Sequence, residues 1–212
     1  MSADPDLLAT WTRGWALTRG VSPPVRDDGG WRIEVGAEDQ RRRYVFAGAA
    51  EAVARRAEAV REPYVFLKVC ADAASVRPLL PGRWTLRPAG FLMTLEGTMT
   101  DGPAPADGYR VEIGPDIAPG GPVIFCIVRD ATGAEAGRGR AVIVDDQVIY
   151  DRIAVEPGHR RRGLGGRIMR ALEQAAGSIG KGVLVATEDG QALYRTLGWR
   201  LHSPYTTAVI PA

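Results

Sequence analysis

The stretch Val155-Glu156-Pro157-Gly158-His159-Arg160-Arg161-Arg162-Gly163-Leu164-Gly165-Gly166 decides how the second half of this chain is interpreted. An apolar run typical of a strand ends at Val155, and the apolar periodicity of a helix begins near Leu164. The first N–H groups of a helix have no partner inside the helix, and the macrodipole adds positive potential, so an anion is stabilised there. Glycines let a phosphate approach the backbone closely, and arginines add forked donors. The stretch therefore predicts a diphosphate-binding loop between a strand and a helix.

Other phosphate-binding loops fit this stretch poorly. A P-loop requires Gly-Lys followed by Ser or Thr, which the stretch lacks. A dinucleotide-binding G-x-G-x-x-G pattern would require glycine at the position of Ile168. The alternative without a ligand is a glycine-rich turn that exposes a solvated basic surface.

The elements around the loop follow from alternation, turn residues and helical spacing. From Pro122 to the C-terminus these signals predict the order β-β-β-α-β-α-β-β, after a short strand at 109–113. The predicted strands and helices lie at 122–129, 135–144, 148–155, 164–176, 182–187 and 191–197, with a final β-ribbon at 199–210.

The first half also reads as α/β. Its predicted elements are a helix at 7–17, strands at 31–35 and 44–46, a helix at 49–61, a strand at 64–70, a short helix at 74–80 and a bent ribbon at 84–95. Residues 98–107 have the composition of a linker. We therefore predict an accessory α/β domain at 1–98 and a second domain at 108–212.

Two motifs at matching spacing resemble the GNAT superfamily of N-acetyltransferases. Arg160, Gly163 and Gly165 fit its motif A, Arg/Gln-x-x-Gly-x-Gly/Ala, and the segment Ala192-Leu193-Tyr194-Arg195-Thr196-Leu197-Gly198-Trp199 resembles its motif B. The resemblance covers roughly residues 109–212. It implies an α/β fold with a GNAT-like mixed central sheet flanked by helices, beside a smaller N-terminal α/β half.

The resemblance also implies an activity and a set of site residues. It implies direct transfer of acetyl from acetyl-CoA to a primary amine of a small molecule or peptide, in one ternary complex and without a metal. The Val155 N–H would stabilise the oxyanion, and Tyr194 would protonate the departing thiolate. Backbone groups of three residues would pair with the pantetheine arm: Ile153, Ala154 and Val155. The loop residues that would bind the cofactor are Arg160, Arg161, Arg162, Gly163, Leu164, Gly165 and Gly166.

The acceptor amine must lose a proton, and Asp151 is the leading candidate for the base. It lies on the strand predicted at 148–155, where regular alternation would place it on one face with Ile153 and Val155. The alternative is a structural ion pair with Arg152 or another arginine. For Tyr194 the alternative is simple packing. Two further carboxylates are weaker candidates for the base: Glu156 and Asp146.

The chain departs from the family in two places. It contains no Asn, although the family often has one between its penultimate strand and short helix, where this chain has 188–191. The stretch between Ile113 and Pro122 is too short for the two helices that usually shape the acceptor pocket, so we expect the N-terminal half to wall it. These departures keep a second hypothesis open, a catalytically idle acyl-CoA-binding or sensing module.

The N-terminal half resembles a degenerate copy of the same unit. Residues 33–35 followed by Gln40-Arg41-Arg42-Arg43-Tyr44 line up with 153–155 followed by 160–164. In this alignment Arg43 and Val45 replace the loop glycines, which predicts that the first copy holds no cofactor. The alternative is two unrelated α/β segments with chance similarity.

Composition narrows the remaining function classes. A net charge of +2 gives no global field for nucleic acid or membranes, so we expect neither as a partner. Cys70 and Cys126 are too few for a disulfide framework and predict reduced, buried thiols. The two histidines, His159 and His202, have no metal-ligand spacing. The N-terminus does not read as a signal peptide, so we expect a cytoplasmic monomer or homodimer.

Overall fold

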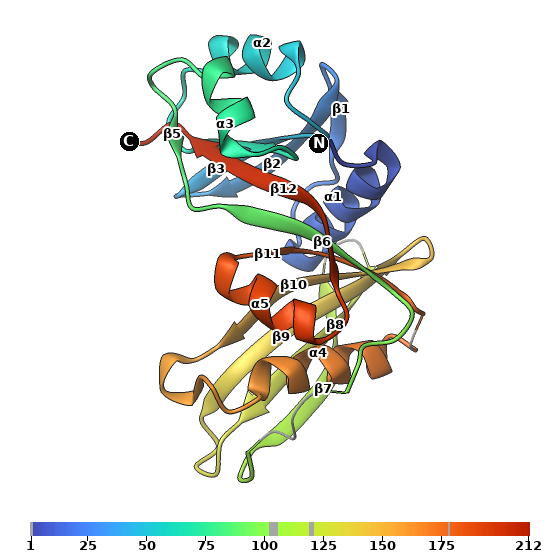
Figure 1. Ribbon diagram of the computed structural model, residues 1–212. Coiled ribbons are helices and arrows are strands. Elements are labelled where there is room, and N and C mark those ends of the chain that lie inside the picture. Colours follow the sequence, from blue (N-terminus) through green and yellow to red (C-terminus); the bar gives the residue numbers. More distant parts are fainter. Residues whose placement is uncertain (1, 102–105, 119–120, 178) are drawn as a thin grey trace.

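One twelve-stranded sheet runs through the computed structural model, which describes residues 2–101, 106–118, 121–177 and 179–212 (Figure 1). The strands are β1 (Val25–Asp27), β2 (Gly30–Ala37), β3 (Gln40–Phe46), β4 (Val65–Val69), β5 (Thr85–Leu86), β6 (Gly90–Glu96), β7 (Arg110–Ala118), β8 (Gly121–Arg129), β9 (Glu135–Val144), β10 (Gln147–Val155), β11 (Lys181–Ala186) and β12 (Arg200–Val209). They are hydrogen-bonded in the order β1-β2-β3-β4-β12-β6-β11-β10-β9-β8-β7, with β5 beside β12.

Each half of the chain contributes one strand that pairs with strands of the other half. The last strand, β12, pairs with β6 through 200–205 and then with β4 of the first half through 206–209. In return β6 pairs antiparallel with β11 along its whole length. The sheet is therefore continuous across the predicted boundary, and the division into domains at 1–98 and 108–212 stays a prediction.

The predicted elements of the second half are confirmed up to the short helix at 191–197, but the final β-ribbon was wrong, because 200–209 form the single strand β12. The antiparallel strands β8, β9 and β10 are followed by α4 (Leu164–Ala175), β11, α5 (Glu188–Thr196) and β12, with a 3-10 turn at Pro157–His159. Strands β7 and β8 form an antiparallel hairpin, so the two helices judged missing from the sequence have no place there. The mixed α/β class predicted from the sequence is confirmed.

The first half contains α1 (Pro5–Arg19), α2 (Glu51–Ala59) and α3 (Ala73–Val76), the last continued by a 3-10 turn at Arg77–Leu79. Asp4 caps α1, because its carboxylate accepts hydrogen bonds from the backbone of Asp6 and Leu7. Gly20, in the left-handed conformation, ends the helix.

The proposed alignment of the two halves was wrong in detail. Gln40 to Tyr44 do not form a loop equivalent to the diphosphate loop; they lie in β3, which pairs with β2 and runs parallel to β4. Arg43 and Val45 are therefore strand residues. The parallel pair β3–β4 with α2 between them instead matches the parallel pair β10–β11 with α4 between them. In this comparison residues 47–50, between β3 and α2, correspond to the loop, and the repeat itself stays a prediction.

The helices cover the sheet on alternate faces. Helix α4 packs against one face of β8, β9 and β10, in a core that includes Tyr150. Helix α1 packs on the opposite face of β9 and β10, in a core that includes Ile149 and also side chains of the first half such as Val45. Helix α2 belongs to a third core, on the first half of the sheet. Helix α1 is thus shared by both halves.

A close approach fixes α1 on the sheet. A Cβ added at Gly14 would lie 2.4, 2.7 and 2.9 Å from three side-chain atoms of Ile149 in β10. Only glycine fits this crossing.

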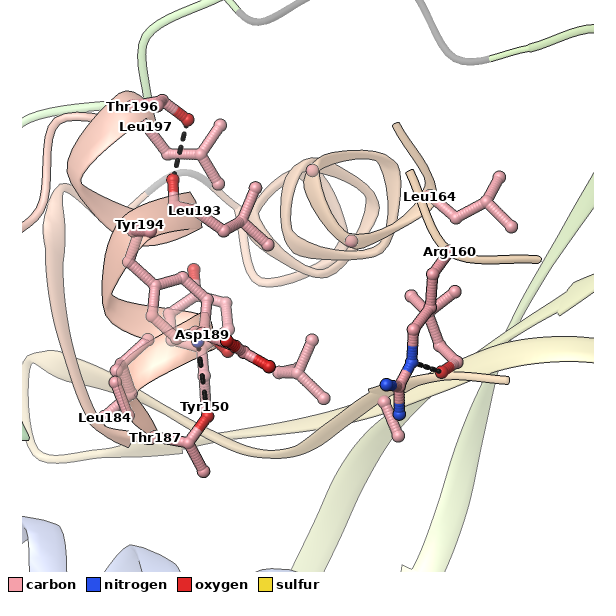
Figure 2. A pocket seen from close by; sticks show the side chains of 18 of the residues that line it. Tyr150, Arg160, Leu164, Leu184, Thr187, Asp189, Leu193, Tyr194, Thr196 and Leu197 are labelled. Atoms are coloured by element: carbon pink, nitrogen blue, oxygen red, sulfur yellow. Dashed lines mark hydrogen bonds between the residues drawn. The ribbon is translucent and has the colours of Figure 1, made fainter. Parts of the chain in front are cut away.

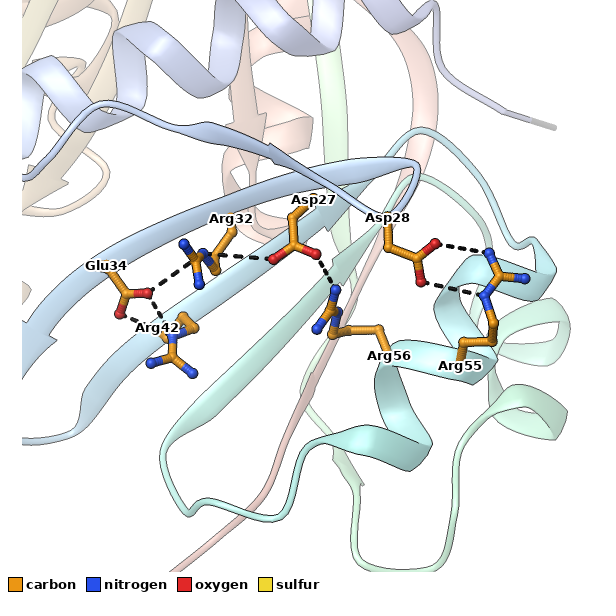
Figure 3. Close-up of polar contacts among 7 residues, drawn as sticks. All are labelled: Asp27, Asp28, Arg32, Glu34, Arg42, Arg55 and Arg56. Carbon is orange, nitrogen blue, oxygen red and sulfur yellow. Dashed lines mark hydrogen bonds and ion pairs between the residues drawn. The ribbon is translucent and has the colours of Figure 1, made fainter.

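Ion pairs tie the first hairpin to α2 (Figure 3). Arg56 of α2 pairs with Asp27, and Arg55 pairs with Asp28 at 2.9 Å. Between β2 and β3, Arg42 donates to Glu34 at 2.7 Å. Most of these side chains are partly exposed, so each pair contributes little to stability.

Candidate functional site

The two central parallel strands separate and leave a cleft between them. Strands β10 and β11 pair only at Val148↔Gly182 and Ile149↔Val183, although β10 continues to Val155 and β11 to Ala186. The cleft has a volume of about 820 Å³ and is lined by the end of β10, the following loop, the start of α4, the end of β11 and α5. Figure 2 shows Arg160 and Leu164 on one side of this space and Tyr194 of α5 on the other.

The start of α4 provides backbone donors to the cleft. Its N-cap is Gly163, in the left-handed conformation with φ 75°, and no side chain of the described residues caps the helix. The first bond that closes the helix runs from the Arg167 N–H to the Gly163 carbonyl, so the N–H groups before it have no helical partner. The helix start therefore has the free N–H groups that the predicted anion site requires, and binding of an anion there stays a prediction.

Glycine at 165 has a packing role as well. A Cβ there would lie 2.6 Å from Cδ2 of Leu193 in α5, so the glycine also lets α4 and α5 approach. A Cβ at Gly166 would meet only the Arg170 guanidinium, at 3.4 Å or more, which is ordinary contact.

The structure places all but one of the predicted cofactor-binding residues on the cleft. Those that line it are Ile153, Ala154, Val155, Arg160, Arg161, Gly163, Leu164, Gly165 and Gly166. Arg162 is not among them; its Nη1 donates to the Tyr109 hydroxyl at 3.1 Å. That hydroxyl also contacts His159 Nδ1 at 2.9 Å, so Arg162 supports the loop from behind.

Sequence reasoning missed Arg170, which lies in the second turn of α4 and lines the cleft. Its Nη1 is buried without a hydrogen-bond partner among the described residues. An unpaired buried guanidinium donor is costly, and an anion in the cleft would satisfy it. The spacing Gly166–Arg170, four residues on one helix face, was the available signal.

A bulge in β10 overturns the expected alternation. The pairing with β9 shifts between Asp151 and Ala154, and Arg152 has φ 55°. Ile153 and Val155 consequently pack toward the α4 core, whereas Asp151 faces α1. The prediction that Asp151 shares their face was wrong because strict alternation fails at a bulge.

The carboxylate of Asp151 is held by α1. It accepts hydrogen bonds from Arg19 Nε at 2.7 Å, Arg19 Nη2 at 3.1 Å and the Thr18 hydroxyl at 3.0 Å. The ion-pair alternative for this residue is therefore present, with Arg19 as the partner. Asp151 still borders the cleft, whereas Glu156 and Asp146 do not; they pair with Arg138 and Lys181. Helix α1 of the N-terminal half thus contacts Asp151 beside the cleft, but the residues that line the cleft all lie within 150–197, so a wall formed by the N-terminal half stays a prediction.

The backbone direction at the end of β10 suits the role expected for Val155. The Glu156 N–H donates to the Ala136 carbonyl on β9 at 3.0 Å. Because successive N–H groups of an extended chain point to opposite sides, the Val155 N–H points away from β9 and into the cleft.

Tyr194 lies on α5 with its ring against Trp199, centroids 6.0 Å apart, and borders the cleft. Burial, with a smaller contribution from Asp151, raises the pKa of Tyr194 well above the usual value for a phenol. It therefore stays protonated at neutral pH. Thr187 caps α5, and Asp189 lines the cleft in the stretch where the family often has an Asn.

Two further properties of the described residues bear on the site. They contain no cluster of three or more His, Cys, Asp or Glu side chains that could hold a metal ion. None of the helices in the described ranges is long and apolar enough to cross a membrane.

Comparison with known proteins agrees with this geometry. A sequence model of the acetyltransferase (GNAT) domain matches residues 121–201. No curated protein matches the chain. A GCN5-related N-acetyltransferase from Kribbella flavida is similar in structure, with TM-score 0.67 and 14% identity over 99% of this chain and 96% of that one.

Two other structures are similar over most of the chain. A GCN5-related N-acetyltransferase-like protein from Streptococcus suis has TM-score 0.61 and 11% identity, covering 96% of this chain and 97% of its own. A tandem GNAT protein from the clavulanic acid biosynthesis pathway has TM-score 0.53 and 14% identity, covering 81% of this chain and 75% of its own. The chain therefore contains an acetyltransferase (GNAT) domain and has the fold of the GNAT superfamily.

Proposed function

We propose that this protein is an acetyl-CoA-dependent N-acetyltransferase that acts on a primary amine. The observation that carries the proposal is the cleft between β10 and β11, which ends at an uncapped helix start rich in glycine and arginine. A strand edge supplies hydrogen-bonding backbone for a pantetheine arm, and a helix start stabilises a diphosphate. Acetyl-CoA carries both groups, and the orphaned donor of Arg170 fits the same charge.

The chain's own residues divide the work along this cleft. The N–H groups at the start of α4, with Arg161, would hold the diphosphate. The Val155 N–H would donate to the thioester oxygen as negative charge develops there. Tyr194, kept protonated by burial, would give its proton to the departing sulfur.

The acceptor amine attacks as the free base, so its ammonium form must first lose a proton. We propose that Asp151 accepts this proton, directly or through a water molecule. Its position between α1 and the cleft supports the role, and Arg19 holds its carboxylate in place. Transfer then occurs directly in one ternary complex, with no acyl-enzyme.

The test is thiol release from acetyl-CoA in the presence of a panel of amines, measured together with calorimetric binding of acetyl-CoA. We expect binding, and amine-dependent release of CoA with a matching N-acetyl product. Binding without turnover of any amine would instead support the idle acyl-CoA-binding module, and lack of binding would refute both.

We further propose that the N-terminal half is a degenerate copy of the catalytic unit. The matching parallel pairs β3–β4 and β10–β11, and the exchange of β6 and β12, support a duplicated ancestry. A tandem GNAT protein is among the similar structures. If the first copy were competent, acetyl-CoA would titrate with two sites per chain; we expect one.

A further inference from the structure

Two basic side chains of the first half, Arg43 and Lys68, lie on the face of β3 and β4 that α1 covers. Arg43 of β3 is 6% exposed, and Lys68 of β4 is half-buried. Lys68 is opposite Val45 in the β3–β4 register, so by alternation Arg43 and Lys68 share one face of the sheet. That face is the one covered by α1, because Val45 packs in the core of Trp15.

Neither cation has a carboxylate partner within 4.0 Å among the residues that the structure describes. Their hydrogen-bond partners are neutral: Arg43 donates to the Gln40 amide oxygen at 3.2 Å, and Lys68 donates to the Thr207 hydroxyl at 3.0 Å. Burial lowers the pKa of Arg43 to about 10, and burial with Arg43 and Arg19 nearby lowers that of Lys68. Buried charges are normally paired, so this arrangement calls for an anion.

Unpaired donors gather at the same place. Arg43 Nε and the Tyr205 hydroxyl are buried without a hydrogen-bond partner among the described residues. Tyr205 lies on β12 two residues before Thr207, the partner of Lys68, and is therefore on the same face. Unsatisfied buried donors destabilise a protein unless a ligand completes them.

This cationic site is linked through Trp15 and Arg19 to Asp151, which lines the cleft. The guanidinium groups of Arg43 and Arg19 both lie over the ring of Trp15 in α1, with their Cζ atoms 3.4 and 4.8 Å from the ring centroid. Arg19 also forms an ion pair with Asp151. Asp151 also acts electrostatically on both Arg43 and Tyr205. Its carboxylate is held by Arg19 and forms no ion pair with Arg43 or Lys68. A molecule with an ammonium group near Asp151 and an anionic group near Lys68 would match this charge pattern.

We propose that Arg43, Lys68 and Tyr205 bind a carboxylate of the acceptor, and that the acceptor is therefore an amino acid or another small amine that carries a carboxylate. This inference rests on the proposed acetyltransferase function and specifies its substrate class.

The first test compares each common L-amino acid with its own carboxamide as acceptor, by release of CoA. We expect kcat/KM for the best acid to exceed that for its amide by about 100-fold, because the amide leaves the cations unpaired. The amide's amino group is less basic and so more often unprotonated at neutral pH, which works against this preference.

Substitutions distinguish loss of carboxylate binding from a general loss of folding or activity. Lys68→Met should reduce the acid-to-amide ratio by about 10-fold or more, and Lys68→Arg should restore most of it. Tyr205→Phe should also reduce the ratio while leaving thermal stability unchanged, because the hydroxyl it removes has no partner. Lys181→Met is the matched control, since Lys181 is the other lysine of the chain and pairs with Asp146 at the surface.

A binding test distinguishes failure of this inference from failure of the proposed function. The protein saturated with CoA is titrated with N-acetyl-L-amino acids and with their amides. Tighter binding of the acids that Lys68→Met removes would support the carboxylate site even if no amine is turned over. Turnover of amines with no preference for acids, or equal binding of acids and amides, would overturn it.

Discussion

Replacing Gly166 by alanine should strengthen the free protein and weaken its binding of acetyl-CoA. Gly166 lies in the first turn of α4, and an added Cβ meets only the end of the Arg170 side chain at 3.4 Å. Alanine in a helix is favoured over glycine by about 0.5–1 kcal/mol. The melting temperature should therefore rise by about 1–4 °C for a chain of this size.

The same substitution should weaken the binding of acetyl-CoA. The added methyl group stands between the helix start and the guanidinium that line the cleft, where the diphosphate must approach. Losing one charge-assisted hydrogen bond costs about 1.5–3 kcal/mol, so the Kd for acetyl-CoA should rise about 10- to 150-fold.

Calorimetric titration measures the affinity and thermal melting without ligand measures the stability. Gly158→Ala is the matched control, because nothing lies within 4 Å of a Cβ there, and its affinity should not change. An unchanged Kd for Gly166→Ala, with the expected rise in melting temperature, would refute the assignment of the α4 start as the diphosphate site.

Three other substitutions test separate parts of the account. Gly14→Ala should lower stability by about 1–3 kcal/mol, because its Cβ would overlap Ile149. Gly82→Ala is the control and should be neutral, because no atom lies within 4 Å of a Cβ there. Equal melting temperatures for the two variants would show that α1 can shift freely. Tyr194→Phe should lower kcat about 100-fold with little change in acetyl-CoA affinity, and the raised pKa of the phenol predicts no loss of rate near pH 10; a parental rate in the variant would disprove the general-acid role. Asp151→Asn should lower kcat with little change in acetyl-CoA affinity, and a parental kcat in the variant would assign the base elsewhere.

Local patterns predicted most of the elements. The helix at 164 and the strands around it follow from apolar periodicity and glycines at the ends, which depend on neighbouring residues only. The loop proposed to bind the diphosphate could likewise be located, because uncapped N–H groups, glycines and arginines all lie within one short stretch. The resemblance of the segment around Tyr194 to motif B of the GNAT superfamily then indicated acetyl-CoA as the specific cofactor.

Long-range features escaped prediction. The exchange of β6 and β12 depends on pairing between strands about a hundred residues apart, which no local pattern reports. The bulge at Arg152 was invisible because a non-glycine residue with positive φ leaves no signature in composition, and it moved Asp151 to the opposite face. The cationic pair Arg43–Lys68 emerged only once β3 and β4 were seen to be parallel neighbours.

The central claim is that acetyl-CoA lies between β10 and β11 with its diphosphate at the start of α4. The most direct measurement is a two-dimensional ¹H–¹⁵N spectrum of glycine-labelled protein during titration with acetyl-CoA. We expect the amide signals of Gly163, Gly165 and Gly166 to shift together and saturably, while those of Gly36 and Gly82 stay in place. Saturable binding that leaves the three loop glycines unmoved would contradict the account.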